Sequence, residues 1–406
     1  MGAEQDILML SCAPYDNLIP TTIHEMAHRL ARRHRVVWVD PCPVYIAGPL
    51  SFLARGARFT ALNALRHRGS SGSATVSLPS LTLKGPVVIR RDGMDIVRPR
   101  WHLPLHADTL WSSRLNQAIE AAQLARISVD LAVRRPTLIS FRPDSDVLVR
   151  RLAAARRLYY CLDRWEDFPW AKPAIVRTQE DAVLRQVDRT IAITDELATE
   201  LTVRGADAIT VRNGVDVDLF AAMMRESHPA PAEVAGRTRP IVGFVGSLTG
   251  WIDLELLAGI ARARPHWTLL LVGPAGSADL RPLAALPNVI MPGLVPRDRL
   301  APYLQIIDVA LVPFRINELT RSASPLKLYE YLASGLPVVS SALPEALRCS
   351  PPVYVAEGLD GFIGAIEAAL HCPPGRREEG FSVAHGASWD KRVEEVARLL
   401  TPPGGI

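Results

Sequence analysis

The chain has 406 residues, of which 48% are apolar and 22% are charged, and it carries a formal net charge of +4. This length favours two domains, and the apolar content is that of a globular protein in which each half buries a core. No uncharged apolar run reaches the ~18 residues of a membrane span, and the start MGAEQDILML lacks the basic segment of a secretory signal. The five cysteines contain no C-x-x-C pair, which suits reduced thiols and a cytoplasmic protein. We expect no nucleic-acid partner.

Short runs of Val, Ile and Leu predict the β-strands, and helical stretches separate them. Most runs are continuously apolar rather than alternating, which is typical of parallel strands buried on both faces. This alternation of strand and helix predicts a doubly wound α/β fold. The predicted strands are residues 6–11, 35–40, 136–141, 158–163, 189–194, 208–213, 240–246, 267–273, 288–293, 309–314, 336–341 and 352–357.

The alternation occurs twice, and a polar, Pro-rich stretch at residues 223–240 interrupts it. We therefore expect two Rossmann-like domains that face each other, residues 1–205 and residues 206–384. Residues 385–406 contain an amphipathic helix that we expect to return to the first domain. Residues 43–85 have no regular pattern and are predicted to form a loop.

The segment HEMAHRLARRH at residues 24–34 contains H-E-x-x-H, a zinc-protease pattern. His34 stands where metzincins place a third ligand, but those proteins break the helix at a glycine, and this chain has Ala31, a strong helix former. We expect the helix to continue and to keep His34 away from His24 and His28. An ordinary Arg- and His-rich helix face is therefore favoured over a metalloprotease.

The segment NELTRSASPLKLYEYLASGLPVVSS at residues 317–341 predicts a helix followed by a buried strand. Ser324 and Pro325 suit the N-cap and the first helical position. The hydroxyls of Ser322 and Ser324, together with the free amides of the helix start, predict a site for a diphosphate.

Two charged residues of the same helix extend this prediction. Lys327 lies in the first turn, where it adds a positive charge to the diphosphate site. Glu330 lies about 7.5 Å along the helix from Pro325, where its carboxylate can accept hydrogen bonds from both hydroxyls of a ribose. The alternative is that Lys327 and Glu330, three residues apart, only pair with each other.

This segment and several others, in the same order, resemble the nucleotide-sugar-binding half of GT-B glycosyltransferases of the GT4 type. The resemblance covers residues 180–400 well and the N-terminal half more loosely. It implies two facing domains with a deep cleft and a metal-independent transfer of a sugar from a nucleotide-diphosphate sugar, with UDP favoured. The matching stretches are ITDELATELTVRGADAITVRNGVDVDLF (193–220), IVGFVGSLTGWIDLELL (241–257), LLLVGPAG (269–276), NVIMPGLVPRDRLAPYLQIIDVALVPF (288–314), SWDKR (388–392) and, before them, IHEMAHRLARRHRVVWVDP (23–41) and YYCLDRWEDF (159–168).

The resemblance, combined with the helix start, nominates the residues that hold the donor. Many GT4 members carry a second Glu eight residues before the ribose Glu, and that position is Ser322 here. We therefore propose that Asn317, Glu318 and Thr320 contact the sugar instead. The expected donor-binding residues are Gly246, Ser247, Gly293, Val295, Arg321, Ser322, Ser324, Pro325, Leu326, Lys327 and Glu330.

The glycine loop GSLTGWID at residues 246–253 also departs from the family, because it lacks the usual basic residue. Neutralisation of the phosphates then depends on Lys327, Arg321 and the amides of the loop. The patterns Asp144-Ser145-Asp146 and Asp216-Val217-Asp218 match the D-x-D metal motif of the other glycosyltransferase fold, but such short matches are common by chance. A helix N-terminus can replace the cation, so no metal and no cofactor is expected.

On the acceptor side, Asp163 ends a predicted strand at the edge where α/β sheets bind ligands. It is the candidate general base if the reaction inverts the sugar, and the alternative is a carboxylate that caps the next turn. Asp16 is a second candidate. Residues 49–68 mix apolar and arginine residues, which suits either contact with the inner face of a membrane beside a lipid-linked acceptor or ordinary amphipathic packing.

The sequence therefore predicts a glycosyltransferase whose acceptor is a cell-surface glycan, a lipid-linked molecule or a natural product. A sugar-nucleotide epimerase of the same fold is the nearest alternative. The missing second Glu and the missing loop base also leave open a catalytically dead protein that binds nucleotide sugars.

Overall fold

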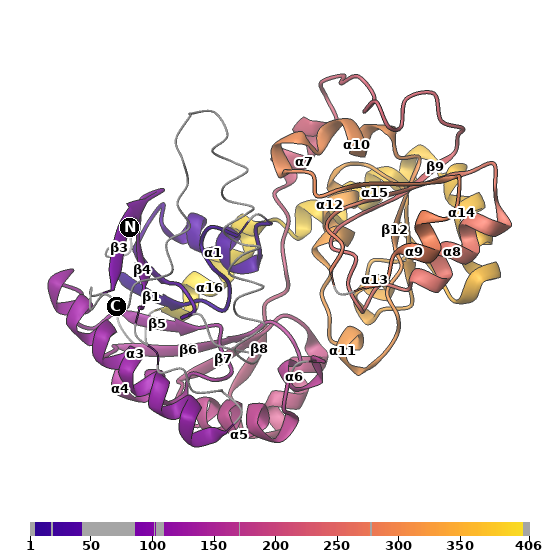
Figure 1. The fold of residues 1–406 in the computed structure, drawn as a ribbon. Coiled ribbons are helices and arrows are strands. Elements are labelled where there is room, and N and C mark those ends of the chain that lie inside the picture. The colour runs from indigo at the N-terminus through magenta and orange to yellow at the C-terminus, as the bar shows by residue number, and fades with distance from the viewer. Residues whose placement is uncertain are drawn as a thin grey trace, which may run out of the picture.

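The computed structural model describes residues 5–17, 19–42, 86–100, 102, 109–169, 171–276 and 278–400. Within them the chain forms two β-sheets, each with helices on both faces, so the predicted doubly wound α/β class is confirmed (Figure 1). The predicted loop at residues 43–85 and the proposed membrane segment at residues 49–68 lie outside the described residues. None of the helices in the described ranges combines the length and the apolar character needed to cross a membrane.

The first sheet has eight strands among the described residues, in the order β3-β4-β2-β1-β5-β6-β7-β8. Neighbouring strands are parallel except β3 and β4. Helices α3, α4 and α5 line one side of this sheet, whereas α1 lies on the other (Figure 1). The elements are β1 (Asp6–Leu10), α1 (Thr22–Leu30), β2 (Arg35–Val39), β3 (Val87–Arg91), β4 (Met94–Arg98), α3 (Leu110–Asp130), β5 (Thr137–Ser140), α4 (Asp146–Arg151), β6 (Arg156–Cys161), η1 (Trp165–Asp167), α5 (Pro173–Leu184), β7 (Arg189–Ala192), α6 (Asp195–Val203) and β8 (Ala208–Thr210).

The second sheet has six parallel strands in the order β11-β10-β9-β12-β13-β14. Its elements are α7 (Val217–Met223), β9 (Ile241–Val245), α8 (Leu254–Ala263), β10 (Thr268–Val272), α9 (Arg281–Ala284), β11 (Val289–Gly293), η2 (Arg297–Arg299), α10 (Ala301–Ile306), β12 (Val309–Val312), α11 (Glu318–Arg321), α12 (Leu326–Ala333), β13 (Val338–Ser341), α13 (Pro344–Arg348), β14 (Val353–Ala356), α14 (Gly358–Leu370) and α15 (Pro374–Gly386). We call the elements of the first sheet the first domain and those of the second sheet the second domain.

Alternate side chains of the second sheet enter two separate cores, because successive residues of a strand point to opposite faces. Ile241 and Val245 of β9 pack in the core that contains α12. Val242 and Phe244 of the same strand pack in the core that contains α8 and α14. The continuously apolar strands of the sequence therefore reflect burial on both faces.

Strand β8 lies beyond the domain boundary that the sequence suggested at residue 205. It pairs with β7 in parallel, so residues 208–210 belong to the first sheet. The second domain therefore begins after β8, near Asn213.

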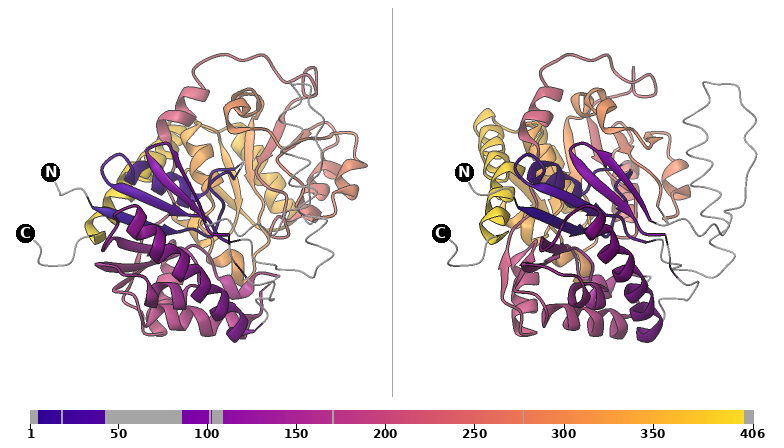
Figure 2. Two further views of the ribbon diagram at one scale, coloured as in Figure 1. Left: turned by 60° about the vertical axis from the view of Figure 1, so that its left-hand side comes forward. Right: turned by 90° about the vertical axis from the view of Figure 1, so that its left-hand side faces the viewer.

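The last helix, α16 (Trp389–Leu400), returns from the second domain to the first. Trp389, Val396 and Leu400 are buried in the core of the first domain, and α16 packs against α1. The further views in Figure 2 show the same arrangement from two other sides. One chain thus crosses between the domains twice.

A β-hairpin, β3–β4, was not predicted. Its strands pair in antiparallel fashion around Asp92 and Gly93, whose φ angles are 50° and 79°. Positive φ at both central residues is the geometry that favours Asp-Gly turns. The Asp-Gly pair between two Val- and Ile-containing runs was the signal that would have revealed the hairpin.

The prediction that the first helix continues past Ala31 is wrong. Helix α1 ends at Leu30 with Ala31 as its C-cap, and residues 31–33 form a turn. The amide of His34 donates to the carbonyl of Leu30 at 2.9 Å, which closes this turn before β2 begins.

Candidate functional site

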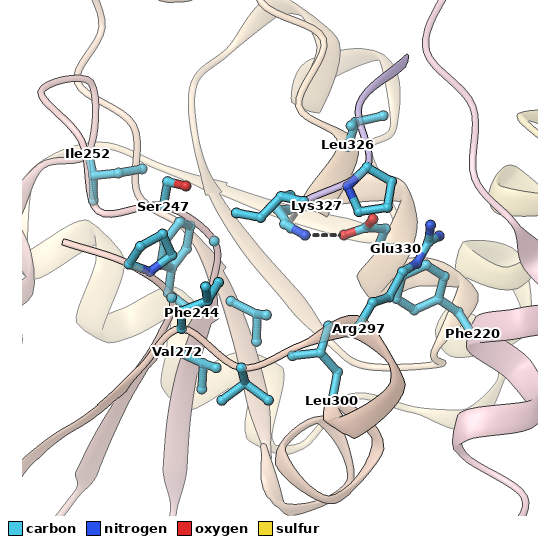
Figure 3. Close-up of a pocket in the computed structure, with 18 of the residues that line it drawn as sticks. Phe220, Phe244, Ser247, Ile252, Val272, Arg297, Leu300, Leu326, Lys327 and Glu330 are labelled. Carbon is cyan, nitrogen blue, oxygen red and sulfur yellow. Dashed lines mark hydrogen bonds and ion pairs between the residues drawn. The ribbon is translucent and has the colours of Figure 1, made fainter. Parts of the chain in front are cut away.

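A cavity of about 330 Å³ lies between the two domains. The second domain provides most of its wall, at the carboxyl ends of β9, β10, β11 and β12, where parallel α/β sheets bind ligands. The first domain contributes Ile19, Pro20 and Glu25. Of the predicted donor-binding residues, Gly246, Ser247, Val295, Leu326, Lys327 and Glu330 line this cavity (Figure 3).

Two glycines bring the loops after β9 and β10 into close contact. A Cβ atom on Gly273, whose φ is +146°, would lie 1.9 Å from the carbonyl oxygen of Gly246. No other residue fits there, since this φ and this distance both require glycine. The cavity wall therefore has exposed main chain at Gly246, followed by the small side chain of Ser247.

The start of α12 differs from the prediction. The N-cap is Pro325, with φ −66° and ψ 117°, and not Ser324. Ser324 is buried, and its hydroxyl lies 3.5 Å from Glu345 Oε1. Ser322 is also buried, and its hydroxyl donates to the carbonyl of Glu318 at 3.1 Å. Both hydroxyls are therefore engaged inside the protein, and an anion at this helix start would meet main-chain amides rather than serine side chains.

Asn213 positions the start of α12, a role that the sequence analysis missed. Its Nδ2 donates to the carbonyl of Ser324 at 2.7 Å, and its Oδ1 accepts a hydrogen bond from the hydroxyl of Thr22 at 2.7 Å. One buried side chain therefore links the first helix of the first domain to the helix start of the second domain. The Asn-Gly-Val-Asp motif was recognised in the sequence, but its position gave no indication of these partners.

Lys327 and Glu330 pair with each other on the cavity-facing side of α12. The Lys327 Nζ donates to Glu330 Oε2 at 2.6 Å, and the two side chains are 23% and 14% exposed (Figure 3). The simple ion pair that the sequence left as an alternative is thus present. Because both groups line the cavity, the pair also presents a cation and a carboxylate to any molecule that enters it.

Arg297 and Glu25 are cavity residues that the sequence analysis did not nominate as site residues. Arg297 begins η2, and its Nη1 donates to Glu25 Oε1 of α1 at 2.5 Å. The guanidinium carbon of Arg297 lies 5.5 Å from the centroid of the Phe220 ring, which also lines the cavity. This ion pair joins the two domains across the site.

The remaining donor candidates lie around the cavity rather than in its wall. Gly293 ends β11 with a φ of 80°, and its carbonyl accepts a hydrogen bond from Gly273 at 2.8 Å, so it supports the loop that leads to Val295. Arg321 is exposed at the end of α11 and is not among the described cavity residues.

The three candidates for sugar contact differ in the exposure of their side chains and in the hydrogen bonds that these already make. Asn317 caps α11, and its Oδ1 accepts a hydrogen bond from the amide of Thr320 at 3.0 Å. Thr320 is buried, and its hydroxyl donates to the carbonyl of Arg315 at 2.5 Å. Glu318 is exposed and accepts a hydrogen bond from Arg164 of the first domain at 2.9 Å. Asn317 and Glu318 are thus exposed residues, whereas Thr320 is buried.

Asp163 follows β6 at the carboxyl edge of the first sheet. Burial raises the pKa of its carboxyl group to about 7, so the group exchanges protons near neutral pH. It is not among the described residues that line the cavity. Two neighbours, however, contact the second domain: Arg164 pairs with Glu318, and the Phe168 ring meets the Trp251 ring edge-on at 6.3 Å. The Asp163 loop therefore lies at the boundary between the domains.

Asp16 occupies a different environment. Its two carboxylate oxygens accept hydrogen bonds from Arg91 and Arg98 on the β3–β4 hairpin. It is not one of the described cavity residues. With both oxygens engaged by guanidinium groups, Asp16 is less suited than Asp163 to accept a proton.

The residues of the H-E-x-x-H pattern serve other purposes. His24 is buried, with Nδ1 2.9 Å from the hydroxyl of Thr21 and Nε2 3.1 Å from the carbonyl of Pro14. Glu25 pairs with two arginines. In the described part of the chain, no group of three or more His, Cys, Asp or Glu residues is arranged to hold a metal ion.

Sequence comparisons point to one family. Residues 239–371 match the family described as Glycosyl transferases group 1, and this stretch includes Lys327 and Glu330. Over 208 residues, or 48% of this chain, the sequence is 31% identical to the "Putative teichuronic acid biosynthesis glycosyltransferase TuaH" of Bacillus subtilis strain 168. That match spans about half, 52%, of the length of the relative.

Solved structures of several glycosyltransferases have a similar overall fold. Sucrose-phosphate synthase from Thermosynechococcus elongatus gives a TM-score of 0.69 at 14% identity, covering 98% of each chain. A UDP-forming trehalose-phosphate synthase from Burkholderia xenovorans gives 0.66 at 14% identity, covering 98% of this chain and 100% of the other. HepE of Anabaena, solved with UDP and glucose, gives 0.61 at 13% identity, covering 98% and 99%.

At these identities the structural likeness establishes the fold, and the predicted GT-B architecture is confirmed. The narrower GT4 assignment stays a prediction. The chain is therefore a protein of the GT-B glycosyltransferase fold, whose residues 239–371 match the group 1 glycosyl transferases.

Proposed function

We propose that this protein transfers a sugar from a UDP-sugar to the hydroxyl group of an acceptor. The observation that carries the proposal is the arrangement of Lys327 and Glu330 on the first turns of α12, in a cavity between the two domains that Gly246 and Ser247 also line. This arrangement offers amides and a cation to a diphosphate and a carboxylate to a ribose.

In the proposed complex the diphosphate lies at the start of α12, where the first amides have no acceptor within the helix. Lys327 turns from Glu330 to the phosphates, and Glu330 then accepts hydrogen bonds from the ribose hydroxyls. The backbone around Val295 contacts the base. The same amides stabilise the negative charge that develops on the departing diphosphate, which is electrostatic stabilisation by preorganised dipoles.

The acceptor would bind on the first domain, which extends through β8, and the donor on the second domain, which begins near Asn213. If the reaction inverts the sugar, Asp163 would accept the proton of the acceptor hydroxyl, and a pKa of about 7 suits that role at neutral pH. Glu318 is the candidate that we favour for contact with a sugar hydroxyl, because it is 73% exposed and pairs with Arg164, next to Asp163, although it is not one of the described cavity residues.

The comparisons support the choice of UDP and of a glycan acceptor. HepE is described in complex with UDP-glucose, and TuaH is named for teichuronic acid biosynthesis. We therefore favour UDP over GDP or dTDP, and a cell-surface polysaccharide or its lipid-linked precursor as acceptor. A cytoplasmic location with peripheral membrane contact through residues 49–68 is part of the proposal. Cosedimentation with anionic vesicles tests that contact.

The decisive experiment is a titration with UDP, GDP and dTDP, followed by incubation with the corresponding sugar nucleotides. A ligand at 100 times its Kd should stabilise the fold by ~2.7 kcal/mol, which a thermal shift detects. Slow hydrolysis of a UDP-sugar without acceptor supports a transferase, whereas formation of an isomeric sugar nucleotide would support an epimerase. No binding of any nucleotide diphosphate would refute the proposal.

A further inference from the structure

The charged residues of the cavity form two ion pairs, and each pair contains one cation. Lys327 pairs with Glu330 inside the second domain, and Arg297 pairs with Glu25 between the domains. All four residues line the cavity. In this arrangement the cations are neutralised, so a diphosphate gains their full attraction only if the carboxylates give way.

Arg297 is held in a way that leaves hydrogen-bonding capacity unused. Its Nη1 contacts Glu25, and its guanidinium lies over the Phe220 ring, which fixes the plane of the group. Its Nε is buried and has no hydrogen-bond partner among the described residues. A guanidinium group can bind a phosphate through two parallel N–H donors, and here one of its donors is still free.

Glu25 keeps a partner when Arg297 leaves it. Its Oε2 accepts a hydrogen bond from Arg29 Nη1 at 2.6 Å. Arg29 is 8% exposed and also pairs with Asp216 at 2.9 Å and Asp390 at 3.2 Å. Release of Arg297 therefore leaves Glu25 with one guanidinium partner, which it shares with Asp216 and Asp390, and this remaining contact lowers the cost of the exchange.

We propose that Arg297 binds the phosphates of the nucleotide, and that Glu25 of the first domain is the counter-ion that the phosphates displace. This inference rests on the proposed function, since it names a second cation for the same donor. It supplies the positive charge that the glycine loop lacks, because Trp251 occupies that loop without a basic residue. It also makes nucleotide affinity depend on a residue of the other domain.

The first test is a titration of the purified full chain with UDP, UMP and uridine. Arg297→Ala should raise the Kd for UDP by about tenfold or more, since a charge-assisted hydrogen bond is lost. Its effect should shrink with UMP and disappear with uridine. Arg299→Ala is the matched control, because Arg299 is an exposed arginine of the same η2 turn and is not among the described cavity residues, and its Kd values should stay within about twofold of the wild type.

The second test removes the counter-ion. Glu25→Gln should tighten UDP binding by about threefold to tenfold, because Arg297 no longer has to leave a carboxylate. In an Arg297→Ala background the same change should have no effect on the Kd. Thermal unfolding of each variant monitors the fold, and Arg297→Lys, which keeps the charge without the planar group, should fall between the wild type and Arg297→Ala.

Three outcomes would overturn the inference. These are an unchanged Kd for UDP in Arg297→Ala, an equal loss of affinity for uridine, or weaker UDP binding in a folded Glu25→Gln variant. If wild-type protein binds UDP and Glu330→Gln weakens that binding, the proposed function survives any of these results. If wild-type protein binds no nucleotide, the proposed function itself is wrong.

Discussion

The ammonium group of Lys327 and the carboxylate of Glu330 bond to each other at 2.6 Å across one turn of α12, at the wall of the interdomain cavity. In this structure each group therefore serves as the other's partner. The proposed donor would separate them, with the phosphates taking Lys327 and the ribose taking Glu330.

Substitutions at these two positions should distinguish the contributions that the nucleoside and the phosphates of UDP make to binding. Glu330→Gln should weaken UDP and uridine alike, by about tenfold, because the ribose loses a charged acceptor. Lys327→Met should weaken UDP by a similar factor but leave uridine unchanged. Isothermal titration measures both, and a uniform loss for all ligands in Lys327→Met would contradict the assignment. Stability should change by less than about 1 kcal/mol, as is usual for a partly exposed pair.

The contact between Gly273 and Gly246 predicts a strict requirement for glycine. In Gly273→Ala the new Cβ meets the carbonyl oxygen of Gly246 at 1.9 Å in a backbone conformation that L-residues avoid. We expect a loss of ~3 kcal/mol or more in the free energy of unfolding, or insoluble protein. Gly250→Ala is the control, in the loop of Gly246 that Gly273 contacts, since its Cβ meets nothing within 4 Å. Urea unfolding that shows equal stability for both variants would disprove this account.

The raised pKa of Asp163 predicts an effect of pH on stability and on activity. The folded protein holds the proton of this carboxyl group up to a pKa of about 7, against an ordinary value of 3.8. The protonated Asp163 carboxyl group therefore contributes its full stabilisation of the folded state below about pH 4, and this contribution is lost as the pH rises through 7. Asp163→Asn removes this loss, so the variant should be more stable than the wild type above pH 7, on the order of 2 kcal/mol, and equally stable near pH 4.

The activity of the wild type should change in the opposite direction. If Asp163 is the base, turnover rises with pH through an apparent pKa near 7, and Asp163→Asn is inactive at every pH. Asp167→Asn, an exposed acid of the same loop, should keep both the activity and the pH profile. A pH profile without a step near 7 would exclude Asp163 as the base.

From the two hydrogen bonds of Asn213 we predict that its amide nitrogen contributes more to the free energy of unfolding than the volume of its side chain does. Asn213→Ala loses both bonds and should cost ~2–3 kcal/mol in the free energy of unfolding. Asn213→Asp should cost at least as much, because a carboxylate oxygen would face the carbonyl of Ser324. Thr22→Val removes one of the two bonds and should cost about half as much. Chemical denaturation ranks the stabilities of the three variants. An Asn213→Asp variant as stable as the wild type would contradict the proposed role of the amide nitrogen.

Strand positions were predictable from the sequence because strands buried on both faces are continuously apolar. Each of the twelve predicted strands overlaps a strand of the structure, from β1 at Asp6–Leu10 to β14 at Val353–Ala356, and only β6, at Arg156–Cys161, begins before its predicted range. The β3–β4 hairpin was missed because its outer strand is largely exposed and its apolar run of three residues ends at Arg90 and Arg91. There the turn residues were more informative than the apolar pattern.

Only part of the site could be predicted from the sequence. Glu330 and Lys327 lie on one helix, so their spacing determines that they share a face. The Ser324 cap was wrong by one residue, because Asn213 draws the Ser324 carbonyl into a contact between segments 111 residues apart. Arg297 meets Glu25 across 272 residues of sequence, and no local pattern indicates such a pair.

Because α16 returns to the first domain, this domain can finish folding only after the second domain has been synthesised. Trp389, Val396 and Leu400 fill a core whose other members are made hundreds of residues earlier by the ribosome. The first domain therefore waits with an open apolar surface while the second domain emerges and folds. A chaperone that shields this surface during translation would find its binding site on the nascent chain, and the finished protein would no longer offer it.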